Sequence, residues 1–490
     1  ASRIQYPVER RALVAAILER QNLGWGAGPK VIENIARFRA GAAAVVTGQQ
    51  VGLFGGPAFS IYKALSAVKL AGEARRLGID CVPVFWLATE DHDLAEVDQA
   101  HVPSADGKLE SLAGEVESGP DAPVGTVSLG PEISREVSRL RELVGESEWA
   151  DAIAECYRPD ENFGSAFAKL YSRWFADHGV ILLDGSDPEL DQIARPLYLA
   201  ALDESEEITR SLVRRNQELE TLGYHQQVRV TESSTLFFLI RDRARVPVQA
   251  RNPGEFLIAE EKLSRRELRE RADRSPESLS PNVLLRPVAQ DYLLPTLAYV
   301  GGAAEIAYFA QAGALQRQLL GRATPVVPRL SATIVEPKTR ALLEKNRLAA
   351  SDVFQPVEAV RELIGARRLP PNLEASFDQA AAAIERSMKA VGECLAELDK
   401  TLVESAENAK SKMLYQVTNL RARASRSELR QSEVIGRHAD SLSQSLYPEK
   451  VLQERRFAGI YFLAKYGQEW MNGLVDTIHP DCLNHQIIEL

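Results

Sequence analysis

The stretch from residue 43 to residue 93 constrains the fold more than any other part of this chain. It reads as an apolar strand (Ala43 to Val46), a glycine-rich turn (Thr47 to Pro57), a helix, and a second apolar strand (Cys81 to Ala88). Two strand-length apolar runs joined by a helix are typical of a right-handed βαβ unit. The segment therefore predicts an α/β fold built on a doubly wound parallel sheet.

The turn and the end of the second strand carry the candidate chemistry. A turn that opens a helix presents backbone N–H groups and the positive helix end, which suits a phosphate or a carboxylate. Ligands of open α/β sheets bind beyond the carboxyl ends of the strands, so we expect the turn and the strand end to share one pocket. A purely structural turn is the alternative. The candidate binding residues here are Thr47, Gln49, Gln50, Gly52, Gly55 and Gly56.

The second strand ends in four consecutive polar residues, Glu90, Asp91, His92 and Asp93. Because side chains alternate along an extended chain, we expect two of them to face the pocket and two to have supporting roles. They could act as a general base for an attacking amine, bind a substrate ammonium, or hold a Mg²⁺ through carboxylates. A solvated acidic loop is the alternative.

A second polar cluster lies within apolar sequence nearer the C-terminus. Arginine matches the geometry of a carboxylate or a phosphate, so Arg286 or Arg329 could bind an anionic substrate. A buried salt bridge, for Arg286 with Asp291 or Glu305, is the competing interpretation. The candidate binding residues of this region are Asn282, Arg286, Gln290, Glu305 and Arg329.

The pattern along the chain predicts a sheet domain with insertions, followed by a helical C-terminal third. We expect short strands at Val124 to Leu129 and Gln227 to Val230, and one long helix from Pro188 to Leu222. The expected parts are the first part of the core (1–96), an inserted connecting segment (97–160), the core continued (161–223), a small β-rich insertion (224–279), the core completed (280–370), a coiled coil (371–446) and a C-terminal helical segment (447–490).

The helical third shows a heptad pattern. Apolar residues from Phe377 to Leu402 step alternately by four and three residues, and Met413, Val417, Leu420 and Ala424 continue at this spacing. The pattern predicts an antiparallel helical hairpin whose outer face forms a dimer surface. A helix pair that packs only on its own domain is the alternative.

Composition excludes several classes of protein. The net charge is −10, whereas a protein that binds nucleic acid needs a basic face. The most apolar stretch, Leu293 to Ala310, is interrupted by polar residues, glycine and proline and is therefore not expected to span a membrane. The four cysteines are far apart, which disfavours a zinc clamp or disulfide framework and predicts a reducing cytoplasm. No signal peptide is visible, and because the chain opens on Ala1 we expect that an N-terminal piece is missing.

Several motifs, taken together and in order, resemble one family. They are Thr47 to Leu53, Gly56-Pro57, Pro83 to Trp86, Glu90 to Asp93, Asn282 with Arg286-Pro287, Pro295-Thr296, Gly301 to Glu305, Pro328-Arg329 and Gln453 to Arg455. This set is similar to the bacillithiol biosynthesis cysteine-adding enzymes, the BshC cysteine ligases. The chain has Gly302-Ala303-Ala304-Glu305 where the family tends to have Gly-Pro-Gly-Glu.

The resemblance implies a Rossmann-like core, a coiled coil that forms a homodimer, and a ligase that joins cysteine to glucosaminyl-malate through an amide bond. We expect ATP-dependent activation of the cysteine carboxylate, with ADP or AMP formed, possible use of Mg²⁺, and proton transfer to His92 or Asp91. Two other hypotheses are a non-catalytic scaffold that binds a nucleotide or a sugar acid, and an acyl-adenylate synthetase for another amino acid.

Overall fold

A computed structural model describes residues 4–114, 116, 119, 121–242, 244–252, 254–367, 371–431 and 433–490. The chain forms two compact units. The first contains Ala1–Ser104, Glu110–Ser331 and Glu454–His485, and the second contains Ala105–Leu109, Ala332–Gln453 and Gln486–Leu490. The main divisions thus fall after residues 331 and 453. The sequence placed the first of these divisions after residue 370, which lies outside the described residues, and the second after residue 446.

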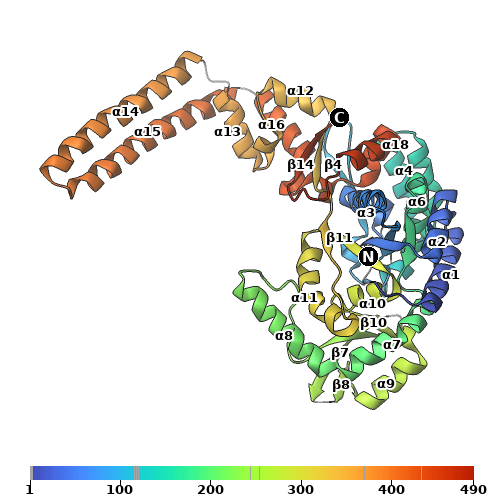
Figure 1. Cartoon of the computed structure of the whole chain (residues 1–490). Coiled ribbons are helices and arrows are strands. Elements are labelled where there is room, and N and C mark those ends of the chain that lie inside the picture. Colours follow the sequence, from blue (N-terminus) through green and yellow to red (C-terminus); the bar gives the residue numbers. More distant parts are fainter. Residues whose placement is uncertain are drawn as a thin grey trace. The chain divides into compact units, whose positions relative to one another are not determined.

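The core of the first unit is a five-stranded parallel sheet of order β12-β11-β1-β2-β5 (Figure 1). Its strands are β1 (Ala43–Gln49), β2 (Cys81–Leu87), β5 (Ile181–Asp184), β11 (Thr296–Gly301) and β12 (Val326–Pro328). The chain leaves β1 in one direction through β2 and β5, and then returns to the other side of β1 for β11 and β12. The doubly wound α/β prediction is confirmed, and the switch point, where open sheets bind ligands, lies between β1 and β11.

Helices cover both faces of this sheet. Ala44 and Val46 of β1 share a buried cluster with the first two helices, whereas Val45 packs against Ala67 and Ala71 of the third. Because neighbouring side chains of a strand point to opposite faces, a continuous apolar run such as β1 requires this double cover. The covering helices are α1 (Val8–Gly24), α2 (Pro29–Ala40), α3 (Ala58–Arg76) and α6 (Phe163–Trp174).

Segments between the core strands, together with α18 from the C-terminal part of the chain, build the rest of the first unit. An antiparallel sheet of order β10-β6-β7-β8-β9 forms the predicted β-rich insertion. The elements are β3 (Gln99–Pro103), β4 (Leu109–Ala113), α4 (Ile133–Val144), α5 (Glu148–Cys156), α7 (Pro188–Asp203), α8 (Ser205–Thr221), β6 (Ser234–Arg241), β7 (Ala244–Asn252), β8 (Glu255–Ile258), β9 (Glu261–Ser264), α9 (Arg265–Arg274), β10 (Leu279–Pro281), α10 (Arg286–Leu293), α11 (Ala303–Leu320) and α18 (Gly459–Thr477).

Three predictions of secondary structure in these insertions are wrong. Residues 124–126 form a 3-10 turn, because the amides of Val124 and Gly125 donate to carbonyls at the end of β2. Residues 227–230 are not a strand, because the side-chain amide of Gln311 takes the place of a strand partner for Val228. The long helix is divided at Glu204, whose backbone (φ −97°, ψ 11°) leaves the helical region.

The second unit is mainly helical, and it contains the predicted hairpin. Its two long helices, α14 (Pro371–Leu398) and α15 (Leu402–Gln431), run side by side in opposite directions (Figure 1), and Arg421 forms an ion pair with Asp378. The other elements are β13 (Ala332–Val335), α12 (Pro337–Lys345), α13 (Val357–Arg367), α16 (Glu433–Leu446), α17 (Gln453–Arg456) and β14 (Gln486–Glu489), of which α17 lies mostly in the first unit. No helix in the described part of the chain has the length and apolar character needed to cross a bilayer.

Candidate active site

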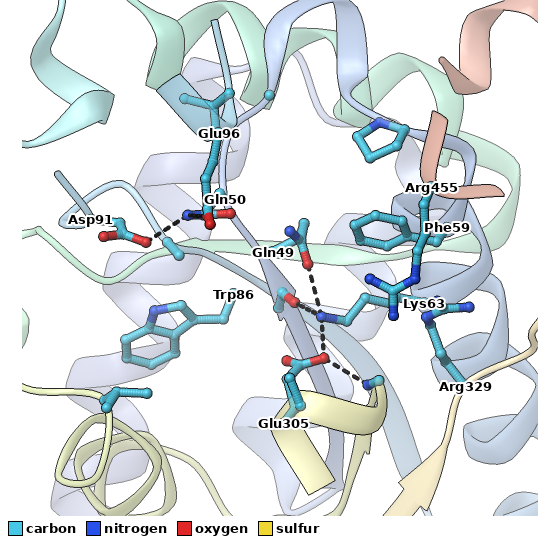
Figure 2. A pocket seen from close by; sticks show the side chains of 18 of the residues that line it. Gln49, Gln50, Phe59, Lys63, Trp86, Asp91, Glu96, Glu305, Arg329 and Arg455 are labelled. Atoms are coloured by element: carbon cyan, nitrogen blue, oxygen red, sulfur yellow. Dashed lines mark hydrogen bonds and ion pairs between the residues drawn. The ribbon is translucent and has the colours of Figure 1, made fainter. Parts of the chain in front are cut away.

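A cavity of about 680 Å³ opens at the carboxyl edge of the parallel sheet, at the switch point between β1 and β11. Its lining comes from the end of β1, the tip after β2, the starts of α10 and α11, and Arg455, Arg456 and Ala458 (Figure 2). Of the predicted site residues, those lining the cavity are Gln49, Gln50, Gly52, Glu90, Asp91, Asn282, Arg286, Glu305 and Arg329. Those outside the lining are Thr47, Gly55, Gly56, His92, Asp93 and Gln290.

The backbone of the glycine-rich turn is engaged within the protein. The amide of Leu53 donates to the Val97 carbonyl (2.8 Å) and that of Gly55 to the Tyr157 hydroxyl (3.2 Å). At the start of α3, the amide of Ala58 donates to the Phe457 carbonyl (2.8 Å). These three amides are therefore not available to an anion, which favours the structural interpretation of the turn at these positions. Anion binding by the turn stays a prediction, and side chains of the cavity offer further donors.

Three of the predicted binding residues have structural contacts that explain them. Gly55 has φ +87°, and a Cβ atom there would lie 2.4 Å from the Trp174 ring. Thr47 is buried and donates from Oγ1 to the Val300 carbonyl at 2.8 Å. Gln290 is buried and donates to Asp291 at 3.2 Å. We therefore assign these residues to the support of the cavity.

A buried lysine that the sequence analysis missed joins the two sides of the switch point. The ammonium of Lys63, on α3, donates to the Gly48 carbonyl, to Gln49 Oε1 (3.0 Å) and to Glu305 Oε2 (2.6 Å). Burial lowers the pKa of Lys63 despite the nearby Glu305 carboxylate. Because Gln49 accepts with its oxygen, its amide nitrogen is left as a donor for a ligand. The apolar stripe of α3 gave no sign that one lysine faces inward.

Glu305 is held in place from three sides. Its carboxylate accepts from the Tyr299 hydroxyl (2.6 Å), from the Gly302 amide (2.7 Å) and from Lys63. Burial acts to raise the pKa of this carboxyl, but the Lys63 charge and the hydrogen bonds from Gly302, Lys63 and Tyr299 together outweigh it and hold the pKa below its ordinary value. Glu305 therefore stays ionised and caps the N-terminus of α11 as an internal anion.

Glu90 is the reactive candidate of the acidic tip. It lines the cavity, and its Oε2 atom is buried without a hydrogen-bond partner in the described structure. Burial raises the pKa of Glu90 despite the opposing charges of Arg286 and Arg245. A desolvated carboxylate with a free oxygen and a raised pKa has the properties of a general base.

The other three residues of the tip have different surroundings. Asp91 also lines the cavity, but it accepts from Gln50 Nε2 (2.7 Å) and from the His92 amide (2.8 Å). The His92 ring lies outside the lining, with Nδ1 3.4 Å from an Arg245 nitrogen, and Asp93 is exposed. Two of the four residues thus face the cavity, as expected, but they are neighbours and do not alternate. Residues 89 and 90 form a turn, so the chain after β2 is not extended, which explains the difference.

Two arginines near Glu90 differ in their hydrogen-bond partners. Arg286, at the start of α10, donates to the Tyr308 hydroxyl (2.9 Å), and no carboxylate of the described residues lies within 4.0 Å of its guanidinium. Arg245, from β7, is buried with 7% of its side chain exposed, and its Nε has no partner among the described residues. Sequence analysis missed Arg245 because it reaches the cavity from the inserted sheet.

Arg329 is a lining residue whose charge is already paired. Its guanidinium makes two bonds to Glu454, at 3.1 and 2.7 Å, and both side chains are more than 90% buried. Arg286 does not form the ion pair with Asp291 or Glu305 that was its alternative, and Asp291 accepts from Gln316 and Thr324 instead. The salt-bridge alternative therefore describes Arg329, with a partner from a distant part of the chain.

The described residues contain no group of three or more His, Cys, Asp or Glu side chains arranged to hold a metal ion. Several cationic and donor side chains line the cavity. Arg286 and Arg455 of α17 have no ion pair among the described residues, Arg245 lies 3.9 Å from an Asp91 oxygen, and the amide nitrogen of Gln49 is a further donor.

Comparisons with known proteins cover the whole chain. Residues 2–330 match the model "Bacillithiol biosynthesis BshC, N-terminal Rossmann-like domain", and residues 332–490 match "Bacillithiol biosynthesis BshC, C-terminal coiled-coil domain". The Koribacter versatilis protein named "Putative cysteine ligase BshC" is 47% identical over 100% of this chain and 92% of its own length. Proteins of the same name from Solibacter usitatus (36% identical, 100% and 91% covered) and Salinibacter ruber (32%, 98% and 89%) also match. The chain belongs to the BshC family, with its Rossmann-like and coiled-coil domains.

Proposed function

We propose that this protein is a ligase that joins the carboxyl group of L-cysteine to the amine of glucosaminyl-malate in bacillithiol biosynthesis. The observation that carries the proposal is the Glu90 carboxylate, with one buried oxygen unpartnered, in the same switch-point cavity as Arg286, in a chain that matches the BshC family. The name of the relatives supports cysteine as one substrate, and the Glu90 carboxylate and the arginines of the cavity support amide formation.

The chemistry requires activation of the acid and deprotonation of the amine. A free carboxylate does not condense with an amine in water, so we propose that ATP with Mg²⁺ activates the cysteine carboxylate. Attack by the amine then forms the C–N bond, the activating group leaves with its electron pair, and the amine loses a proton. Glu90 is placed to accept that proton, in preference to His92 or Asp91, and Arg286 and Gln49 are the donors available to the carboxylate oxygens.

Incubation with cysteine, glucosaminyl-malate and ATP-Mg²⁺ should yield the cysteinyl amide, detected by mass spectrometry as a new thiol product. Omission of ATP should abolish the product, and serine in place of cysteine should give much less. Absence of product with every nucleoside triphosphate would contradict the ligase function and favour the scaffold hypothesis. Nucleotide consumption driven by another amino acid would favour the acyl-adenylate synthetase.

We also propose that α14 and α15 form a homodimer surface. Phe377, Ile384 and Val417 are half-buried in the seam between the two helices, whereas Met413 and Leu420 are 46% and 59% exposed. Exposed apolar side chains seven residues apart lie on one helix face, which suits contact with the helix pair of a second copy.

Cytoplasmic location stays a prediction, and the four cysteines are free thiols.

Replacing both Met413 and Leu420 by glutamate should convert the dimer to a monomer, measured as a halved mass by light scattering during gel filtration. The fold should be retained because both side chains are already exposed. The matched control is Gln416→Glu, an exposed polar position on the same helix, which should leave the dimer intact. A wild-type protein that elutes as a monomer at micromolar concentration would contradict the proposal.

A further inference from the structure

We infer that Arg455 determines specificity by binding a carboxylate of the acceptor substrate, an inference that rests on the proposed ligase function. Arg455 lies on α17 and lines the cavity. Its guanidinium has no hydrogen-bond or ion-pair partner among the described residues. The guanidinium carbon lies 5.9 Å from the centre of the Phe59 ring, which holds the planar group at the cavity wall (Figure 2).

The other cations on this side of the cavity are already engaged. Lys63 is paired with Glu305 at 2.6 Å, and Arg329 is paired with Glu454 at 2.7 Å. Arg456 lies with a guanidinium nitrogen 3.0 Å from His101 Nε2. Arg455 therefore contributes a positive charge that no carboxylate of the described structure compensates, in a cavity that must receive an anion.

An acid at this point would be bound by the Arg455 side chain itself. At the nearby helix starts, Glu305 caps α11 and the Ala58 amide of α3 donates to the Phe457 carbonyl. The planar fork of N–H groups matches a carboxylate or a phosphate in a bidentate manner, so KM for the acceptor and KM for ATP distinguish the two acids.

The position of Arg455 also suits an acceptor that has an amine at one end and carboxylates at the other. Figure 2 shows Asp91, of the acidic tip, and Arg455 on opposite sides of Gln49. Glucosaminyl-malate carries an amine on its sugar and two carboxylates on its malate. With the amine at the acidic tip, where Glu90 accepts its proton, the malate extends toward Arg455.

The test compares Arg455→Gln with wild type on two acceptors, glucosaminyl-malate and glucosamine, which lacks the carboxylates. The variant should raise KM for glucosaminyl-malate about ten- to a hundredfold, the usual effect of losing a charged hydrogen-bonded pair. KM for ATP and cysteine should stay unchanged, and the weak use of glucosamine, or its inhibition constant, should be the same in both proteins. Arg455→Lys, which keeps the charge but not the fork, should give an intermediate KM.

The control is Arg266→Gln, which removes a surface arginine of α9 that is 87% exposed and should leave every parameter unchanged. A rise in KM for ATP alone would overturn the inference and assign the phosphate to Arg455. Equal losses on glucosaminyl-malate and glucosamine would also overturn it. Both results differ from failure of the ligase function itself, in which wild type makes no product.

Discussion

Replacing Glu90 by glutamine is expected to lower kcat by about two to four orders of magnitude, the usual contribution of a general base. Glutamine has the same size but cannot accept the amine's proton. The free energy of unfolding should not fall, because Glu90 has a buried oxygen without a partner and its charge is opposed by burial. The measurement is single-turnover amide formation together with urea unfolding of the same preparations.

The pH dependence of kcat tests the same role of Glu90. A base must be deprotonated, so kcat should rise with pH through the raised pKa of Glu90, with its midpoint above about 4.3, the ordinary value for glutamate. Glu90→Gln should lose this acidic limb. Asp93→Asn, which changes an exposed carboxylate three residues away, should keep both the rate and the limb. A full rate in Glu90→Gln would show that another group accepts the proton.

Local patterns were sufficient to predict the core of the fold. The apolar runs of β1 and β2 and the periodicity of α3 are set by neighbours within each segment, and the sheet follows from them. Predictions were wrong where backbone groups bond to partners far along the chain. Val228 looks like part of a strand, but its backbone pairs with the side chain of Gln311, which periodicity does not reveal.

The site shows the same division. Glu90 and Arg286 were predicted because polar residues stand out at the ends of apolar elements. At the glycine-rich turn and the start of α3, the sequence did not show that the amides of Gly55 and Ala58 bond to Tyr157 and Phe457, the latter some 400 residues away in sequence. Lys63 and Arg455 were not predicted as site residues, because each looks like an ordinary charged residue of a helix until the fold places it at the cavity.

Replacing Arg329 by methionine is expected to lower the free energy of unfolding by about 3–5 kcal/mol, the usual cost of breaking a buried ion pair. Glu454 is 1% exposed, and without Arg329 its buried carboxylate would lose two charged hydrogen bonds. Urea unfolding followed by tryptophan fluorescence reports on the first unit, which contains all five tryptophans. They are Trp25, Trp86, Trp149, Trp174 and Trp470.

The double variant Arg329→Met with Glu454→Met separates the ion pair from simple packing. It should regain most of the lost stability, because no unpaired charge is then buried. The contrary result is an Arg329→Met protein of wild-type stability with a raised KM for one substrate. That outcome would mean that the guanidinium leaves Glu454 to bind substrate, as the sequence predicted, and that Arg329 and not only Arg455 meets the anion. Both terminal nitrogens of Arg329 already donate to Glu454, so we expect Arg329→Met to lose stability.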